Sequence, residues 1–199
     1  MSLKSVAIID GGGANIASLA FALDRLNVTS EITSDARTIR AASHVILPGV
    51  GAAADAMDRF RRQRLIDVIR TLSQPVLGIC LGMQLLAVAS DEGSVDCLGL
   101  IPGTAKKMKV GLTFPVPHIG WSRVSYSGDH ELLAGIVDGS YFYFLHSYAL
   151  MVADCTLATA NHSNEFTAIA AYKNFVATQF HPEKSSTAGA RLLANFLKL

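Results

Sequence analysis

Apolar and polar positions alternate along the first half of the chain in a way that predicts strands and helices in turn. Residues 5–9 (SVAII) and 44–47 (HVIL) are apolar runs of the length of a buried strand. Residues 16–26 and 57–72 repeat apolar side chains every few residues, as an amphipathic helix does. Strands that alternate with helices predict a parallel sheet covered on both faces.

Residues 71–90 carry no charged side chain, yet they do not form the pattern of a membrane span. About 20 apolar residues cross a bilayer as a helix, but a proline and two glycines interrupt this stretch and weaken a single helix. We instead expect a buried strand at residues 76–79 (VLGI), a sharp turn at Cys80 and a helix through residues 82–90.

The second half contains runs that are rich in β-branched and aromatic residues and are separated by turn-forming residues. These runs are residues 114–127, 140–150, 156–162, 166–174 and 175–180. Residues 188–199 return to helical spacing. The predicted fold is one α/β domain over residues 1–199, with a central, mostly parallel sheet flanked by helices and with antiparallel strands added in the second half.

Composition narrows the class of protein. Half of the 199 residues are hydrophobic and 17% are charged, which excludes a disordered chain. A net charge of +1 gives no electrostatic reason to expect nucleic acid, and the basic residues 59–64 read as a solvated helix face. Three widely spaced cysteines form neither a disulfide framework nor a zinc pattern. We expect a cytoplasmic protein that binds no metal, nucleic acid or membrane.

Cys80 has a glycine two residues away on each side, the pattern of a strand–turn–helix that presents a nucleophile. A thiol with a pKa near 8.5 is only ~3% ionised at neutral pH, so a catalytic cysteine needs a base or a helix N-terminus beside it. The helix expected to begin at Leu81 would place its N-terminus beside this thiol. The alternative is a buried, inert cysteine, which is common in protein cores.

Among six histidines, His181 is the best candidate for the base, because Glu183 follows it by two residues. In an extended chain such residues project to the same side, so the carboxylate can hold the imidazole in one tautomer. Cys80, His181 and Glu183 would then be nucleophile, base and orienting group. The alternative is a surface turn. His118 and His146 lie in aromatic runs and are expected in the core or at an interface.

Backbone groups near Cys80 are candidate donors to an oxyanion. The N–H of Leu81 follows the nucleophile directly. The loop at residues 48–51 (PGVG) leaves a neighbouring strand and offers the N–H of Val50 or Gly51. The alternative for this loop is a plain strand-ending turn.

Three ordered motifs, PGVG, GICLGMQ and QFHPEKS, resemble those of class I (triad) glutamine amidotransferases, and the resemblance covers essentially the whole chain. Within that class, the chain is most similar to the glutaminase subunits of imidazole glycerol phosphate synthases, which act in histidine biosynthesis. The features that carry this similarity are IID near the start, PHIGW, YFYFLHSY, HPEKS and a length near 200 residues.

The resemblance implies a role for each matching residue. Cys80 would form a glutamyl thioester, with His181 as base and acid and Glu183 as its orienting group. Glutamine would be held by Gly49, Gln84, Ser147 and Tyr148, together with Gly51. The mouth that faces a partner would contain Asn15, Trp121, Tyr143 and Lys184. The implied partner is a (β/α)8-barrel cyclase in a heterodimer, which uses the ammonia released from L-glutamine; no cofactor is implied.

Two short segments depart from the family pattern. The first turn usually reads D-Y-G-x-G-N, whereas residues 10–15 read DGGGAN. The family's G-W-N appears as Gly120-Trp121-Ser122, so an amide is replaced by a hydroxyl. Both changes fall on expected docking contacts and neither touches the triad.

Three other functions stay open at this point. One is a glutaminase for another synthase, such as those of the pyridoxal phosphate, anthranilate or purine routes, although PHIGW and HPEKS disfavour it. Another is a stand-alone cysteine amidohydrolase. The third is a nucleotide-binding regulator that uses residues 11–13 (GGG), although a G-x-G-x-x-G motif would need a glycine in place of Ile16.

Overall fold

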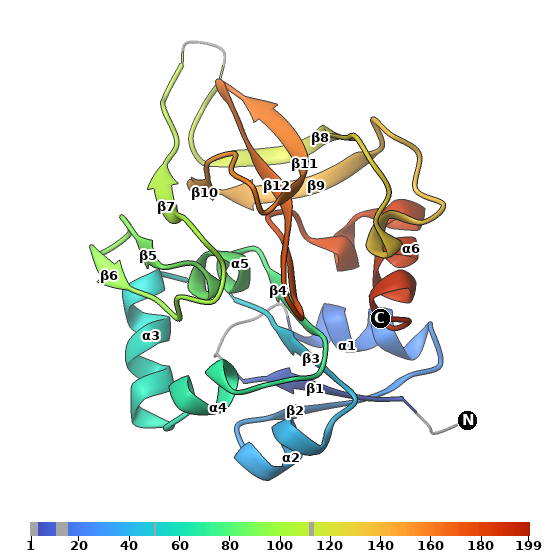
Figure 1. Ribbon diagram of the computed structural model, residues 1–199. Coiled ribbons are helices and arrows are strands. Elements are labelled where there is room, and N and C mark those ends of the chain that lie inside the picture. The colour runs from blue at the N-terminus through green and yellow to red at the C-terminus, as the bar shows by residue number, and fades with distance from the viewer. Residues whose placement is uncertain (1–3, 11–15, 50, 112–113) are drawn as a thin grey trace.

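A nine-stranded sheet runs through the computed structural model, which describes residues 4–10, 16–49, 51–111 and 114–199 (Figure 1). Its strands, in their order across the sheet, are β2 (Thr29–Thr33), β1 (Ser5–Ile9), β3 (His44–Leu47), β4 (Val76–Ile79), β13 (Phe175–Thr178), β12 (Asn164–Tyr172), β11 (Thr156–His162), β8 (His118–Tyr126) and β9 (Tyr141–His146). Neighbours are parallel from β2 to β13 and antiparallel from β13 to β9. The predicted α/β fold is confirmed, and the antiparallel strands extend the same sheet.

Helices cover both faces of the parallel half. They are α1 (Ile16–Asp24), α2 (Ala36–Ala41), α3 (Ala53–Arg62), α4 (Ile66–Arg70), α5 (Leu81–Leu86) and α6 (Ser186–Phe196), with short 3₁₀ helices η1 (Glu131–Leu133) and η2 (Pro182–Lys184). In β1, Val6 and Ile8 pack in the same cluster as α1 and α6, whereas Ala7 and Ile9 pack in the same cluster as α3 and α4. Burial of both faces explains why these strands are continuously apolar.

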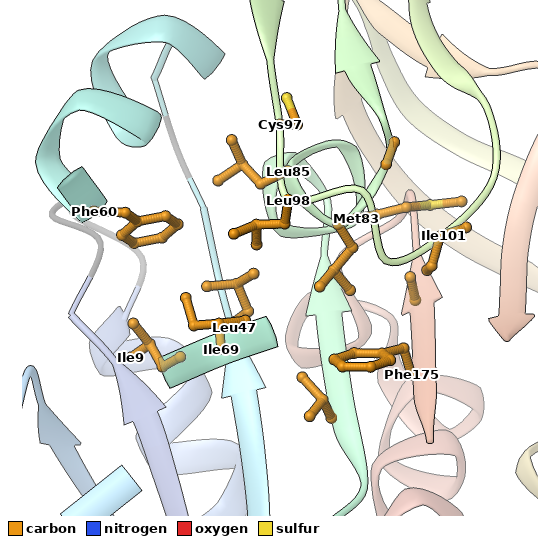
Figure 2. Close-up of a cluster of buried hydrophobic side chains, with 14 of the residues drawn as sticks. Ile9, Leu47, Phe60, Ile69, Met83, Leu85, Cys97, Leu98, Ile101 and Phe175 are labelled. Carbon is orange, nitrogen blue, oxygen red and sulfur yellow. The ribbon is translucent and has the colours of Figure 1, made fainter. Parts of the chain in front are cut away.

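The cluster in Figure 2 fixes α5 against the sheet. Met83 and Leu85 of this short helix belong to a buried cluster with side chains from the sheet and from α3 and α4, among them Ile9, Leu47, Phe60, Ile69 and Phe175. Every residue of α5 is buried, and full burial of one such apolar side chain stabilises the fold by about 2 kcal/mol. Packing therefore sets the position of the turn that precedes α5.

A second sheet of four strands follows α5 in the chain. Its strands, in order, are β10 (Tyr148–Leu150), β7 (Thr104–Lys107), β5 (Ala89–Ser90) and β6 (Val95–Asp96). The helix predicted through residues 82–90 was therefore wrong at its end, because α5 stops at Leu86 and Ala89 pairs with Thr104. Pairing between strands outweighed the local helical pattern. Within the described ranges, no helix has the length and apolarity needed to cross a membrane.

One further prediction needs correction, and one strand was missed. The single helix expected over residues 57–72 is divided into α3 and α4, because the chain turns between them with Arg64 at a φ of 56°. Strand β2 was not predicted, since it is an edge strand without a fully buried residue, and its sequence TSEIT lacks an apolar run.

Gly82 lies where α5 passes closest to β3, so a larger residue there should destabilise the fold. A Cβ at this position would overlap the carbonyl oxygen of Leu47, a backbone atom that cannot turn aside. We predict that Gly82→Ala lowers the free energy of unfolding by about 3 kcal/mol, measured by urea denaturation. Gly111→Ala is the control, because its Cβ would make an ordinary 3.4 Å contact with the side chain of Phe114. Equal stability of the two variants would contradict this account of the packing.

Candidate active site

The sharp turn expected at Cys80 is present and is conformationally strained. Cys80 has φ 54° and ψ −108°, a combination that L-residues rarely adopt. Its N–H donates to the carbonyl of Thr178 in β13 at 2.7 Å, and its own carbonyl accepts from the N–H of Met83 at 3.0 Å. The turn, which we call the Cys80 elbow, is thus held from the sheet on one side and from α5 on the other.

Glycines around the Cys80 elbow allow three segments to approach closely. A Cβ on Gly78 would stand 2.7 Å from a methyl group of Leu86, and one on Gly49 would stand 2.7 Å from Cβ of Leu81. The glycines of the Gly-x-Cys-x-Gly pattern therefore allow the strand, the helix and the loop to pack closely. The strained backbone conformation is that of Cys80 itself.

His181 and Glu183 form a buried pair. Nδ1 of His181 lies 2.8 Å from Oε1 of Glu183, and the two side chains are 4% and 3% exposed. The expected route to this contact was an extended chain, but residues 182–184 form η2, a 3₁₀ helix. The N–H of His181 donates to the carbonyl of Tyr143 in β9 at 2.9 Å, and the hydroxyl of Ser185 donates to the carbonyl of His181 at 2.7 Å. These two bonds fix the backbone of His181 on both sides of the residue.

Cys80 and Glu183 both act on the charge of His181. Burial by itself lowers the pKa of His181, but hydrogen bonds to Cys80 and Glu183, together with the negative charges of these groups, raise it to about 10. Since Nδ1 is used by Glu183, Nε2 is the nitrogen left for the thiol. The three residues therefore form a connected group in which the imidazole lies between the thiol and the carboxyl group.

A cavity of about 240 Å³ opens beside Cys80 and His181. Of the residues predicted for binding or for the oxyanion, those in its wall are Gly49, Gly51, Leu81, Gln84, Ser147 and Tyr148. Ser147 and Tyr148 lie where the chain passes from the large sheet to the small one. Val50 lies outside the described residues. No group of three or more His, Cys, Asp or Glu side chains arranged to hold a metal ion occurs in the described ranges.

Of the predicted partner-facing residues, Trp121, Tyr143 and Lys184 do not line this cavity. Trp121 on β8 and Tyr143 on β9 are directly paired, with ring centroids 6.0 Å apart, and Nζ of Lys184 lies 5.9 Å from the centre of the Tyr143 ring. The structure brings these three together on the outer face of β8 and β9, which we call the β8–β9 face. Asn15 lies outside the described residues.

The sequence did not single out Glu92 or Gln179 for the site, nor Pro117, Leu145 and His146, which also line the cavity. Glu92 lines the cavity, and its Oε2 accepts from the N–H of Ala53 at the start of α3, at 2.9 Å. Gln179 is fully buried; its Nε2 lies 3.7 Å from Sγ of Cys80, and its Oε1 accepts from Nε2 of Gln84 at 3.2 Å. The motif QFHPEKS contains Gln179 and was the available signal for it, whereas Glu92 stands in an ordinary polar turn.

The family of the chain follows from comparison with known proteins. The family model "Glutamine amidotransferase class-I" matches residues 7–199. The chain belongs to this amidotransferase family. The resemblance read from the three motifs is thereby confirmed.

Relatives of this amidotransferase cover nearly its whole length. "Imidazole glycerol phosphate synthase subunit HisH 2" of Legionella pneumophila (strain Lens) is 50% identical over 194 residues, which are 98% of each chain. The subunit HisH of Xanthomonas axonopodis pv. citri (strain 306) is 46% identical over 197 residues, 99% of this chain and 98% of the relative. The solved structure of PurLQS from Thermotoga maritima matches with a TM-score of 0.77 at 15% identity over 98% of both chains, and so shares the fold.

We predict that the imidazole of His181 stays protonated well above neutral pH. Its ¹⁵N NMR titration should give a pKa near 10, and Glu183→Gln should lower this pKa by removing one anion. Glu92→Gln is the control, since it removes a cavity carboxylate that does not act on His181. A pKa at the ordinary 6.5 would contradict the connected group.

The same shift has a consequence for stability. Because the folded-state pKa lies above the ordinary value of 6.5, the charged ring stabilises the fold fully below that pH, and this contribution is lost as the pH rises through about 10. The advantage of the wild type over Glu183→Gln in the free energy of unfolding should therefore shrink across this window.

Proposed function

We propose that the chain is the glutaminase subunit of imidazole glycerol phosphate synthase and that residues 1–199 act as one glutaminase domain. The connected group of Cys80, His181 and Glu183 beside a small cavity carries this proposal. The near full-length similarity to two subunits of that synthase supports the choice among amidotransferases. The substrate would be L-glutamine, and no cofactor is needed for its hydrolysis.

The cavity offers complementary groups for an amino acid with a side-chain amide. Both hydrogens of the Gln84 amide are used, by the carbonyl of Tyr148 at 2.8 Å and by Gln179 at 3.2 Å, which leaves its oxygen to accept from the substrate. The carboxylate of Glu92 matches the α-ammonium group in charge. Gly49 and Ser147 complete the wall, where the backbone can approach the substrate.

The chemistry then divides into two acyl-transfer steps. The Cys80 thiolate attacks the carboxamide carbon of glutamine, and protonated His181 donates its proton to the departing nitrogen, so that ammonia leaves and a thioester remains. A water molecule next attacks the thioester; neutral His181 takes its proton, and glutamate and the thiolate are released. Glu183 keeps the imidazole in position throughout. The N–H groups of Leu81 and of Val50 or Gly51 would stabilise the oxyanion.

The β8–β9 face supports a partner for this reaction. Ile119, Trp121, Tyr141 and Leu145 are 60%, 51%, 52% and 38% exposed, and an apolar patch of this kind marks an interaction surface. Leu145 also lines the cavity, so the patch reaches the site. Free ammonia is protonated in water and loses its nucleophilicity, so a covered passage to an acceptor is needed. The proposed partner is a (β/α)8-barrel cyclase that forms imidazole glycerol phosphate and aminoimidazole carboxamide ribonucleotide.

Replacement of one cysteine should separate the nucleophile from the buried thiols. We predict that Cys80→Ala abolishes glutamine hydrolysis, measured as released glutamate, while the fold is kept. Cys97→Ala and Cys155→Ala are matched controls and should stay active. Burial and the nearby charge of Asp96 raise the pKa of Cys97 to about 11, and burial also raises that of Cys155, so neither thiol ionises readily. Near wild-type turnover by the Cys80→Ala protein would end the proposal.

Glutamine turnover should also depend on the partner. We predict slow hydrolysis by the isolated chain and a rise of roughly a hundredfold or more when the barrel subunit and its nucleotide are present, since one added oxyanion donor is worth about that much. Trp121→Ala should reduce this rise and leave the basal rate unchanged. Tyr172→Ala is the control, because Tyr172 is an exposed aromatic residue where β12 turns into β13, at the strand ends remote from Cys80. Full activity of the isolated chain would instead favour a stand-alone amidohydrolase.

A further inference from the structure

A continuous series of hydrogen bonds connects β8 to the wall of the cavity. Oγ of Ser122 lies 2.9 Å from Nε2 of His118, and Nδ1 of His118 lies 3.1 Å from Nε2 of His146. Nδ1 of His146 lies 3.0 Å from the carbonyl oxygen of Tyr148. That oxygen also accepts from the amide of Gln84 at 2.8 Å. The reaction steps above do not use either histidine.

The donors in this series can be assigned from its fixed end. A carbonyl oxygen only accepts, so Nδ1 of His146 must carry the hydrogen that points at Tyr148. Burial lowers the pKa of His146 to about 3 and that of His118 to about 4, so both rings are neutral at neutral pH. Nε2 of His146 is then an acceptor, His118 must donate from Nδ1, and Ser122 donates its hydroxyl hydrogen to Nε2 of His118. Each tautomer depends on its neighbour.

Neither imidazole ring can rotate freely and so exchange its donor and acceptor nitrogens. His118 and His146 are 3% and 6% exposed. The ring of His118 stacks on Phe144 and on His162, with centroids 4.9 Å and 4.1 Å apart, and His146 packs edge-on against Phe166 at 5.1 Å. Ring rotation would have to displace these aromatic neighbours, so the packing holds this order of donors and acceptors.

We propose that His118 and His146 are positioning residues that hold the Tyr148 carbonyl, and through it Gln84, in the geometry that binds glutamine. The inference rests on the proposed function for the identity of the ligand. Beyond Gln84 the series continues through the amide of Gln179 to Sγ of Cys80, at 3.2 Å and 3.7 Å. The binding wall and the nucleophile are therefore tied to one chain of oriented donors.

The outer end of this series lies beside the β8–β9 face. Ser122 is on the inner side of β8 and follows Trp121, which points outward and pairs with Tyr143 of β9. Contact of a partner with Trp121 would act on the strand that carries the first donor. The hydroxyl of Ser122, which stands where the family pattern has an amide, is that donor.

The test compares two substitutions of equal shape at Ser122. Ser122→Thr keeps the hydroxyl, whereas Ser122→Val replaces it with a methyl group that also keeps water from donating in its place. Ser125→Val is the control, at an exposed position of the same strand. Two quantities are measured in the isolated chain: the tautomers of His118 and His146 by ¹⁵N NMR, and the Kd for L-glutamine by calorimetry in a Cys80→Ala background, where no turnover occurs.

We expect hydrogen on Nδ1 of both rings in the parent protein and in Ser122→Thr. In Ser122→Val, both rings keep hydrogen on Nδ1, but Nε2 of His118 loses its donor, so its ¹⁵N signal shifts toward that of a free lone pair, and the Kd rises about tenfold, as loss of one hydrogen bond would give. Ser125→Val should keep the parent tautomers and a Kd within about twofold.

Three results would overturn the inference. Hydrogen on Nε2 of His146 in the parent protein would break the series at its fixed end. An unchanged ¹⁵N shift of Nε2 of His118 in Ser122→Val would remove the dependence on Ser122. An unchanged Kd in Ser122→Val, with a changed Nε2 shift, would show that the series does not position the binding wall. If the parent bound no glutamine at all, the proposed function would fail instead, and the tautomers would still decide whether the oriented series exists.

Discussion

The left-handed backbone of Cys80 is the constraint on which the rest of the site depends. Such a conformation costs on the order of 1–3 kcal/mol and persists only where its surroundings enforce it. The N–H of Cys80 is held by Thr178 of β13, and the six buried residues of α5 hold the other side. The thiol therefore projects at the end of the parallel strands, where open α/β sheets bind their ligands.

Strand β13 explains how distant parts of the chain meet at this thiol. It is parallel to β4 on one side and antiparallel to β12 on the other, so it joins the two halves of the sheet. The chain leaves β13 toward His181, which is anchored on β9 through the carbonyl of Tyr143. From β9 the chain crosses to the small sheet at Ser147 and forms the cavity wall. Cys80 and His181 thus both follow strands of one sheet, and part of the cavity wall begins where that sheet ends.

Local patterns in the sequence were sufficient for the parts of the site that local geometry determines. The glycines around Cys80 predicted an elbow, and the spacing of His181 and Glu183 predicted a contact between their side chains, although this contact forms through a 3₁₀ turn. Contacts set by strand pairing were not predictable in this way. The entry of Gln179 into the site depends on Cys80 and Gln84, which are remote from it in the chain.

The hydrogen-bond series through His118 and His146 shows the same limit. The aromatic runs predicted that both rings would lie in the core or at an interface, and both are buried. Their mutual contact arises because β8 and β9 pair in a register that places His118 opposite His146. The spacing of residues within one strand does not determine which residues of two strands lie opposite each other. The function of the two rings could therefore be inferred only from the folded chain.

The most direct test of the account is covalent labelling with an electrophilic analogue of glutamine, such as a chloroketone, followed by mass spectrometry of the digested protein. The account predicts one label per chain, on the peptide that contains Cys80, and slower labelling when L-glutamine is present. Labelling of Cys97 or Cys155, or labelling of Cys80 at a rate that glutamine does not change, would contradict the claim that the Cys80 elbow presents the nucleophile to a glutamine site.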